Sequence, residues 1–284
     1  MQLTFMPKNI KTKQDDFGEL SPLLLFVILL FFITSCTTTN QLNNSLSSLE
    51  IKTGNKSTGT GFLFSLSDYV ITSYHVVHGS KSISIRLTNG EKIDATITVQ
   101  DTHNDIAILK LSQPPTSRQN IITLGDSNSV KTGDRVFTYG FPLVGLLGNG
   151  EPRYSEGFVS SLSGISNDPR LFQVSIPIQP GNSGGPVFNE KGELIGIATS
   201  SIDADKTKKV FGSSPQNVNF AIKSSYVNSL LTNLPDTFIK HKGIVPVPIE
   251  KSSFKERVKN DIVLVEVVPQ NQRKVEQPLA KNNR

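Results

Sequence analysis

The segment ISIRLTNGEKIDATITV, residues 83–99, alternates apolar and polar side chains on both sides of Asn89-Gly90. Alternation with a period of two is typical of strands that bury one face, and Asn-Gly is a favoured two-residue turn between antiparallel strands. The segment therefore predicts a β-hairpin.

Further strand-like runs lie outward from this hairpin in two groups. Residues 69–72 and 106–111 join it in a first group, and a polar stretch at 125–133 separates this group from a second one. The second group comprises residues 135–139, 157–160, 171–175, 186–188, 193–197 and 218–222. Closing each group into a barrel would remove exposed strand edges and leave a cleft between the barrels. With 21 Gly, 16 Pro and no Trp, the chain is predicted to be all-β with many turns.

After the strands, residues 224–234 predict one amphipathic helix, ended by Pro235. Residues 235–284 predict an irregular C-terminal extension with one plausible strand at 262–268.

Composition excludes several classes of protein. Hydrophobic residues make up 36% of the 284, which is enough for a core, and the net charge of +5 is dispersed, so binding of nucleic acid is not expected. The single Cys excludes an internal disulfide and Cys-based zinc sites. Because only His75 and His78 of the four His lie close together, we expect neither a metal nor a cofactor.

The N-terminus predicts an export signal. Lys8, Lys11 and Lys13 precede an apolar run at residues 23–33, which is shorter than the roughly 20 residues that span a bilayer. The following Ile33-Thr-Ser-Cys36 resembles the bacterial lipobox, in which the Cys is lipidated. We therefore expect a lipoprotein signal peptide at 1–35, a polar tether at 36–50 and a lipid on Cys36. The alternative is that Cys36 is an ordinary residue of an uncleaved anchor.

Three short segments carry residues suited to nucleophilic catalysis. Gly181-Asn-Ser-Gly-Gly-Pro186 places Ser183 among glycines, His75 follows a predicted strand, and Asp105 precedes another. Such a Ser could be a nucleophile beside backbone N–H groups, such a His a general base, and such an Asp the group that orients it. Taken singly, each has a plainer interpretation as a β-turn, a structural His or a turn residue.

Together these segments resemble the trypsin-like (chymotrypsin-fold) serine proteases, and most closely their HtrA/Deg-type branch. Gly59-Thr-Gly-Phe-Leu63, Asn104-Asp-Ile-Ala-Ile-Leu109, Gly133-Asp-Arg-Val136 and Asn219-Phe-Ala-Ile222 extend the resemblance over residues 51–234. It implies two six-stranded antiparallel β-barrels, at about 51–124 and 134–222, followed by the C-terminal helix. It also implies an endopeptidase in which His75 is the base, Asp105 its orienter and Ser183 the nucleophile. The N–H groups of Gly181 and Ser183 would form the oxyanion hole.

The resemblance also implies a specificity pocket. The residue six before the nucleophile, which forms the base of the S1 pocket in the family, is Pro177, so no acid is available to attract Arg or Lys. Ile178 and the run Ile197, Ala198 and Thr199 would line a small, uncharged pocket that favours Val, Ala or Ile.

The implied substrates are unfolded or flexible polypeptides on the periplasmic or cell-surface side of the membrane. Nothing after Leu234 resembles a PDZ domain, so oligomer formation does not transfer from the family.

Two other functions fit parts of the sequence. Gly181-Asn-Ser-Gly-Gly185 also satisfies the G-x-S-x-G pattern of esterases, but Pro186 disfavours the helix that this pattern needs after the Ser. A protein that keeps the barrels and binds peptides without cleaving them, or that rests in a zymogen-like state, is the other alternative. The Gly-rich segment at 140–153 is either a mobile loop over the cleft or an ordinary surface connection.

Overall fold

The computed structural model describes residues 56–64, 68–117, 122–199, 218–232 and 251–270 of the chain. Contacts divide the chain into Met1–Lys52 and Thr53–Arg284, and all described residues belong to the second unit. The predicted signal peptide, Cys36 and the tether lie outside the described residues. No helix within the described ranges is long and apolar enough to cross a membrane.

The first barrel is a closed sheet of six antiparallel strands in the order β1-β13-β3-β4-β5-β2. The strands are β1 (Ser57–Leu63), β2 (Tyr69–Ser73), β3 (Ser80–Arg86), β4 (Lys92–Asp101), β5 (Ile106–Leu111) and β13 (Ile262–Pro269). The predicted hairpin is formed by β3 and β4. Buried aliphatic side chains such as Val70, Ile85 and Leu109 form the first barrel's own core cluster, as the alternating pattern predicts.

The second barrel also has six antiparallel strands, in the order β10-β7-β8-β9-β12-β11, and a pairing of β10 with β11 closes it. The strands are β7 (Arg135–Gly140), β8 (Arg153–Ser161), β9 (Leu171–Val174), β10 (Pro186–Asn189), β11 (Glu193–Thr199) and β12 (Asn219–Lys223). A two-residue strand, β6 (Thr123–Leu124), adds to β11 in parallel. The prediction of two six-stranded antiparallel barrels is confirmed.

Helices are few and short. They are α2 (Tyr74–Val77), α3 (Val144–Leu147), α5 (Ser224–Leu231) and α7 (Lys251–Val258), with 3-10 turns η1 (Ser127–Ser129), η2 (Ile165–Asn167) and η4 (Lys259–Asp261). The predicted helix at 224–234 is α5, which buries Val227, Leu230 and Leu231 against the core. Helix α3 lies in the Gly-rich segment at 140–153, where no helix was expected.

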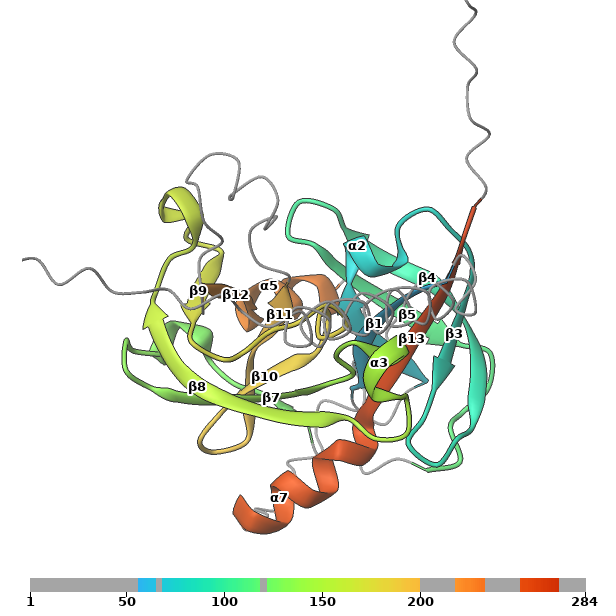
Figure 1. The fold of residues 1–284 in the computed structure, drawn as a ribbon. Coiled ribbons are helices and arrows are strands. Elements are labelled where there is room, and N and C mark those ends of the chain that lie inside the picture. The colour runs from blue at the N-terminus through green and yellow to red at the C-terminus, as the bar shows by residue number, and fades with distance from the viewer. Residues whose placement is uncertain (1–55, 65–67, 118–121, 200–217, 233–250, 271–284) are drawn as a thin grey trace, which may run out of the picture. The chain divides into compact units, whose positions relative to one another are not determined.

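The C-terminal segment corrects the predicted domain boundaries. Strand β13 lies between β1 and β3, so the first barrel does not end near residue 124, and residues 251–270 are not an irregular extension. Figure 1 shows β13 in red among the blue and green strands of this barrel. The local sequence indicated the strand, but its partners lie about 200 residues away in the chain and no local pattern identifies them.

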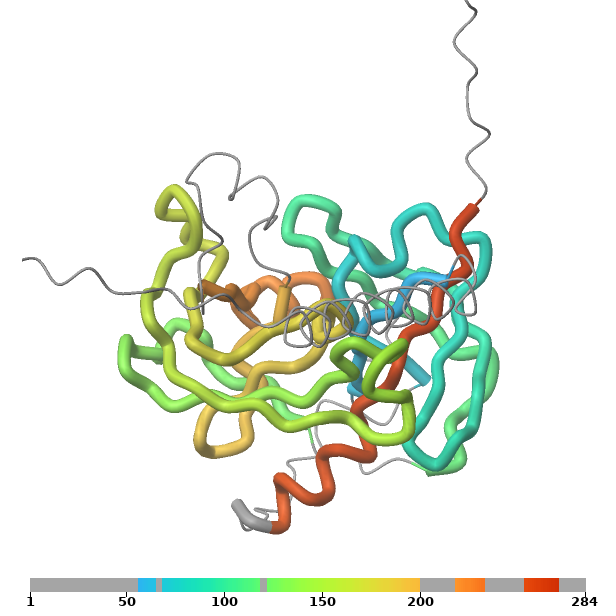
Figure 2. Tube along the Cα trace, in the orientation of Figure 1, coloured from blue at the N-terminus to red at the C-terminus, as the bar shows by residue number. Residues whose placement is uncertain are grey.

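Both faces of β13 are buried over residues 262–265. Val263 and Val265 belong to the first barrel's core cluster, whereas Ile262 and Leu264 belong to a second cluster that includes residues of both barrels. Helix α7, just before β13 in the red part of the trace in Figure 2, adds Phe254 to this shared cluster. The C-terminal segment therefore packs on both barrels.

Candidate active site

Strand register brings His75 and Asp105 together. Antiparallel strands β2 and β5 pair with Ser73 opposite Ile106, so the chain leaves β2 toward His75 at the same end at which it enters β5 from Asp105. His75 Nδ1 lies 2.7 Å from Asp105 Oδ2, and the His75 backbone N–H donates to Asp105 Oδ1 at 2.8 Å. With Nδ1 hydrogen-bonded to the carboxylate, the neutral ring carries its proton on Nδ1 and its lone pair on Nε2.

Ser183 lies in the loop between β9 and β10, and this loop has a conformation that glycine permits. Gly181 and Gly184 have φ values of +100° and +88°, a backbone region that residues with a Cβ rarely adopt. A Cβ on Gly184 would lie 2.2 Å from Thr60 O, and one on Gly181 would lie 2.3 Å from Phe141 O. Gly184 therefore allows the loop to fold tightly against strand β1, and Gly181 allows it to approach the segment that follows β7.

Backbone hydrogen bonds in this loop leave two donors free. The N–H groups of Asn182, Gly184 and Gly185 donate to Gln179 O, Ala198 O and Asn182 O, respectively, at distances of 2.8 to 3.0 Å. Among the described residues, the N–H groups of Gly181 and Ser183 have no hydrogen-bond partner. These are the two groups that the sequence predicts for an oxyanion hole, which requires donors not engaged elsewhere.

Strand β1 connects the Ser183 loop to the first barrel. Thr60 N–H donates to Ser183 O at 2.9 Å, and the buried Thr60 hydroxyl donates to Gly181 O at 2.6 Å. A Cβ on Gly59 would lie 2.5 Å from Val76 Cγ1 and 3.2 Å from Ser183 O, so Gly59 lets helix α2 and the loop approach the same point of β1. The sequence did not predict this role of the Thr60 hydroxyl, although Thr60 lies between the two glycines of the motif Gly59-Thr-Gly-Phe-Leu63.

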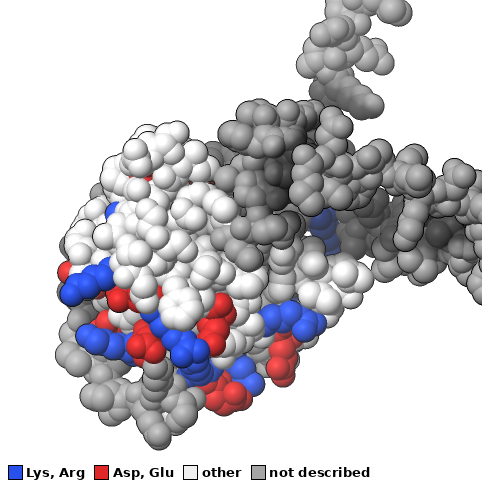
Figure 3. Space-filling view, turned by 60° about the vertical axis from the view of Figure 1, so that its left-hand side comes forward, with Lys and Arg blue, Asp and Glu red and all other residues white. Residues whose placement is uncertain are grey.

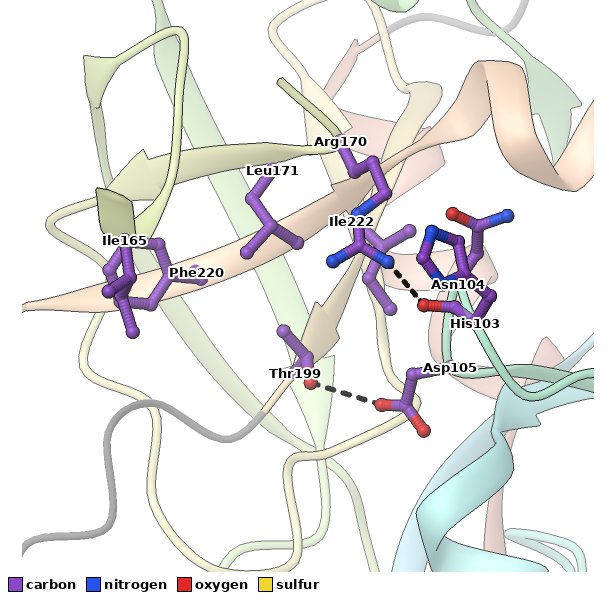
Figure 4. A pocket seen from close by; sticks show the side chains of 9 residues that line it. All are labelled: His103, Asn104, Asp105, Ile165, Arg170, Leu171, Thr199, Phe220 and Ile222. Carbon is purple, nitrogen blue, oxygen red and sulfur yellow. Dashed lines mark hydrogen bonds between the residues drawn. The ribbon is translucent and has the colours of Figure 1, made fainter. Parts of the chain in front are cut away.

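Thr199 lies at the end of β11, and its hydroxyl donates to Asp105 Oδ2 at 3.2 Å. Figure 4 shows this bond at the edge of a pocket of about 200 Å³. The pocket is lined by His103, Asn104, Asp105, Ile165, Arg170, Leu171, Thr199, Phe220 and Ile222. Sequence reasoning placed Thr199 in the wall of a specificity pocket and did not predict its contact with Asp105.

The other residues predicted for the specificity pocket differ in exposure. Pro177 is exposed, whereas Ile178 and Ala198 are buried in the core cluster of the second barrel. Ile197 is fully buried in the cluster shared by both barrels. The pocket assignment stays a prediction, because residues 200–217, which follow this wall, lie outside the described residues.

Charged side chains of both signs lie side by side on the face seen in Figure 3. Arg135 and Glu156 pair at 2.6 Å, and Lys255 Nζ lies 3.9 Å from the same Glu156 carboxylate. Neighbouring opposite charges partly cancel, which weakens the electrostatic attraction of this face for a charged partner.

Known proteins resemble this chain in sequence and in structure. Residues 59–197 match the family described as a trypsin-like peptidase domain. The serine protease Do-like HtrA of Lactococcus lactis subsp. cremoris is 31% identical over 190 residues, which cover 63% of this chain and 45% of that protein. A probable periplasmic serine endoprotease, DegP-like, of Halomonas elongata is 37% identical over 149 residues, covering 50% of this chain and 29% of that protein. The chain thus spans less than half the length of these two relatives.

A solved structure of the HtrA-type protease AlgW with a decapeptide is also similar. It matches with a TM-score of 0.50 and 25% sequence identity, over 64% of this chain and 52% of that one. The two-barrel architecture is therefore similar to that of this HtrA-type protease.

Proposed function

We propose that the protein is a serine endopeptidase with His75, Asp105 and Ser183 as its catalytic triad, because residues 59–197 match the family of trypsin-like peptidase domains. The observation that carries the proposal is the 2.7 Å contact between His75 Nδ1 and Asp105 Oδ2. This contact leaves Nε2 as the basic nitrogen of the ring, which a general base for a Ser hydroxyl requires.

Acyl transfer through Ser183 follows from these roles. Ser183 Oγ attacks the carbonyl carbon of the scissile peptide bond while His75 Nε2 accepts the hydroxyl proton. The N–H groups of Gly181 and Ser183 donate to the oxyanion, and His75 then gives its proton to the departing amine. Water, deprotonated by His75, hydrolyses the resulting ester and regenerates Ser183. Asp105 holds the ring in the required tautomer and stabilises the imidazolium, so the chemistry needs no cofactor.

The proposed substrates are unfolded or flexible polypeptide segments with a small, uncharged residue before the cleaved bond. Pro177, at the predicted base of the S1 pocket, carries no charge that would pair with Arg or Lys, and burying an unpaired cation is costly. An extended substrate backbone can pair with an exposed strand edge of the protease. A folded substrate offers no such extended, unpaired backbone.

The proposed location is outside the cytoplasmic membrane, on its periplasmic or cell-surface side, with a lipid on Cys36 as anchor. The apolar run at 23–33 followed by Cys36 supports export and lipidation. The relative from Halomonas elongata, whose name describes it as periplasmic, supports the export part of this proposal.

Hydrolysis of an unfolded protein by the full-length chain tests the proposal. We expect Ser183→Ala to abolish cleavage and Ser229→Ala, which removes an exposed hydroxyl from α5, to retain it. Both variants should unfold at nearly the wild-type temperature. A wild-type protein that binds unfolded polypeptides but cleaves none would support the alternative of a non-hydrolytic binding protein.

A further inference from the structure

The loop that carries Asp105 has an uncommon backbone conformation. Asp105 has a φ of +55°, in the left-handed region that few residues with a Cβ adopt, although Asp does so more often than most. Inside the loop, Asp101 Oδ1 accepts from the N–H groups of His103 and Asn104 at 3.0 and 2.9 Å. His103 is exposed, and Asn104 and Asp105 are only half-buried, so apolar burial contributes little to holding this loop.

A side chain of the second barrel contacts this loop of the first barrel. Arg170, just before β9, donates from Nη1 to the backbone carbonyl of His103, two residues before Asp105. Figure 4 shows the Arg170 guanidinium pointing across the pocket toward His103 and Asn104. Because a pocket of about 200 Å³ lies here, the barrels do not pack closely at this point, and hydrogen bonds from Arg170 and Thr199 reach the loop from the second barrel.

Asp168 fixes the orientation of this guanidinium. Arg170 Nε donates to Asp168 Oδ1 at 2.9 Å and Arg170 Nη2 to Asp168 Oδ2 at 2.6 Å, an arrangement that uses one side of the planar group. The remaining nitrogen, Nη1, is then aimed at the His103 carbonyl. The hydrogen bond from Arg170 holds the pKa of the Asp168 carboxyl below its usual range, so the pair stays charged at neutral pH.

We propose that Arg170, oriented by Asp168, is a positioning residue that holds the Asp105 loop of the first barrel in register with the second. The inference rests on the proposed function, because its consequence is the alignment of Asp105 with His75. Arg170 touches neither His75 nor Ser183 and acts only through the backbone of the loop. Thr199 holds the carboxylate of Asp105 itself, whereas Arg170 holds the peptide that presents it.

Steady-state kinetics of the full-length protein on a peptide substrate test this role. We expect Arg170→Gln to lower kcat by roughly 10- to 100-fold, the loss typical of a slightly misplaced catalytic group, while KM changes little. Arg170→Lys, which can reach one carbonyl but cannot also form the two-pronged contact with Asp168, should recover part of this loss. Asp168→Asn should lower kcat less, and the double variant Asp168→Asn/Arg170→Gln should be no worse than Arg170→Gln alone, because the two act as a unit.

The matched control is Arg135→Gln. It removes another Arg–carboxylate pair of the second barrel, the 2.6 Å contact with Glu156, which lies outside the proposed site. We expect this variant to keep the wild-type kcat and KM.

A spectroscopic measurement separates this inference from the proposed function. The proton on His75 Nδ1 that is hydrogen-bonded to Asp105 should give a low-field NMR signal in ¹⁵N-histidine-labelled protein. We expect Arg170→Gln to weaken or abolish this signal and Arg135→Gln to preserve it. An active wild-type protein in which Arg170→Gln leaves both kcat and the signal unchanged would overturn the inference. If the wild type hydrolyses no peptide but its signal depends on Arg170, the positioning role stands and the proposed function fails.

Discussion

Replacing Leu264 with Ala tests whether the C-terminal strand is an integral part of the first barrel. Leu264 is fully buried in the apolar cluster shared by both barrels and lies opposite Thr60 in the pairing of β13 with β1. A buried Leu→Ala change removes apolar contacts and leaves a cavity, which costs about 3–5 kcal/mol of unfolding free energy. In a domain of this size, each kcal/mol lowers the melting temperature by roughly 2–4 °C, so we expect a fall of about 6–20 °C.

The effect extends to the active site, because Thr60 also donates its N–H to Ser183 O. Peptidase activity should therefore be lost at the same lowered temperature as the β-sheet circular dichroism signal. Val268→Ala, at a position on the same strand that is 36% exposed, is the control and should change stability by about 0.5 kcal/mol or less. Equal melting temperatures for the two variants would contradict the assignment of β13 to the barrel core.

Three further predictions concern the site, the anchor and the substrate. Thr199→Val removes the hydroxyl that donates to Asp105 Oδ2; a hydrogen bond to a charged group is worth about 1.5–3 kcal/mol, so kcat should fall about 10-fold or more, and unchanged kinetics would refute this role. Cys36→Ser should release a soluble protein or leave an unprocessed precursor, and incorporation of a fatty acid analogue that does not depend on Cys36 would disprove the anchor. Cleavage of a peptide library should fall mainly after Val, Ala or Ile, and dominant cleavage after Arg or Lys would show that the S1 pocket assignment around Pro177 is wrong.

Local sequence was sufficient for most of the fold. Alternation of apolar and polar residues marks strands such as β3 and β4 because one face of each is buried in a barrel. A three-residue turn at 88–90, with Gly90 at a φ of +88°, sets their pairing in place of the two-residue turn that Asn89-Gly90 suggests. The membership of β13 in the first barrel was not predictable in this way. Its pairing with Thr60 and its neighbours joins residues about 200 positions apart, and such pairing depends on the shape of the assembled barrel.

For the candidate site, residue type and order indicated the groups with reactive side chains. The contact between His75 and Asp105 agrees with the roles expected for them, and the register of β2 and β5 explains it. The sequence did not indicate the roles of Arg170 and Thr60, because their partners are backbone atoms. Arg170 contacts a carbonyl and Thr60 a loop oxygen, and neither bond depends on the side chain of the residue that accepts it.

Covalent labelling of the full-length protein by a fluorophosphonate probe, with the modified residue located by mass spectrometry, tests the central claim most directly. Labelling requires an activated nucleophile, its base and the oxyanion donors together. We predict modification at Ser183 alone, abolished in Ser183→Ala and nearly abolished in His75→Ala, because members of a triad act as a unit. A folded wild-type protein that remains unlabelled, or that is labelled at another residue, would contradict the assignment of Ser183 as the nucleophile.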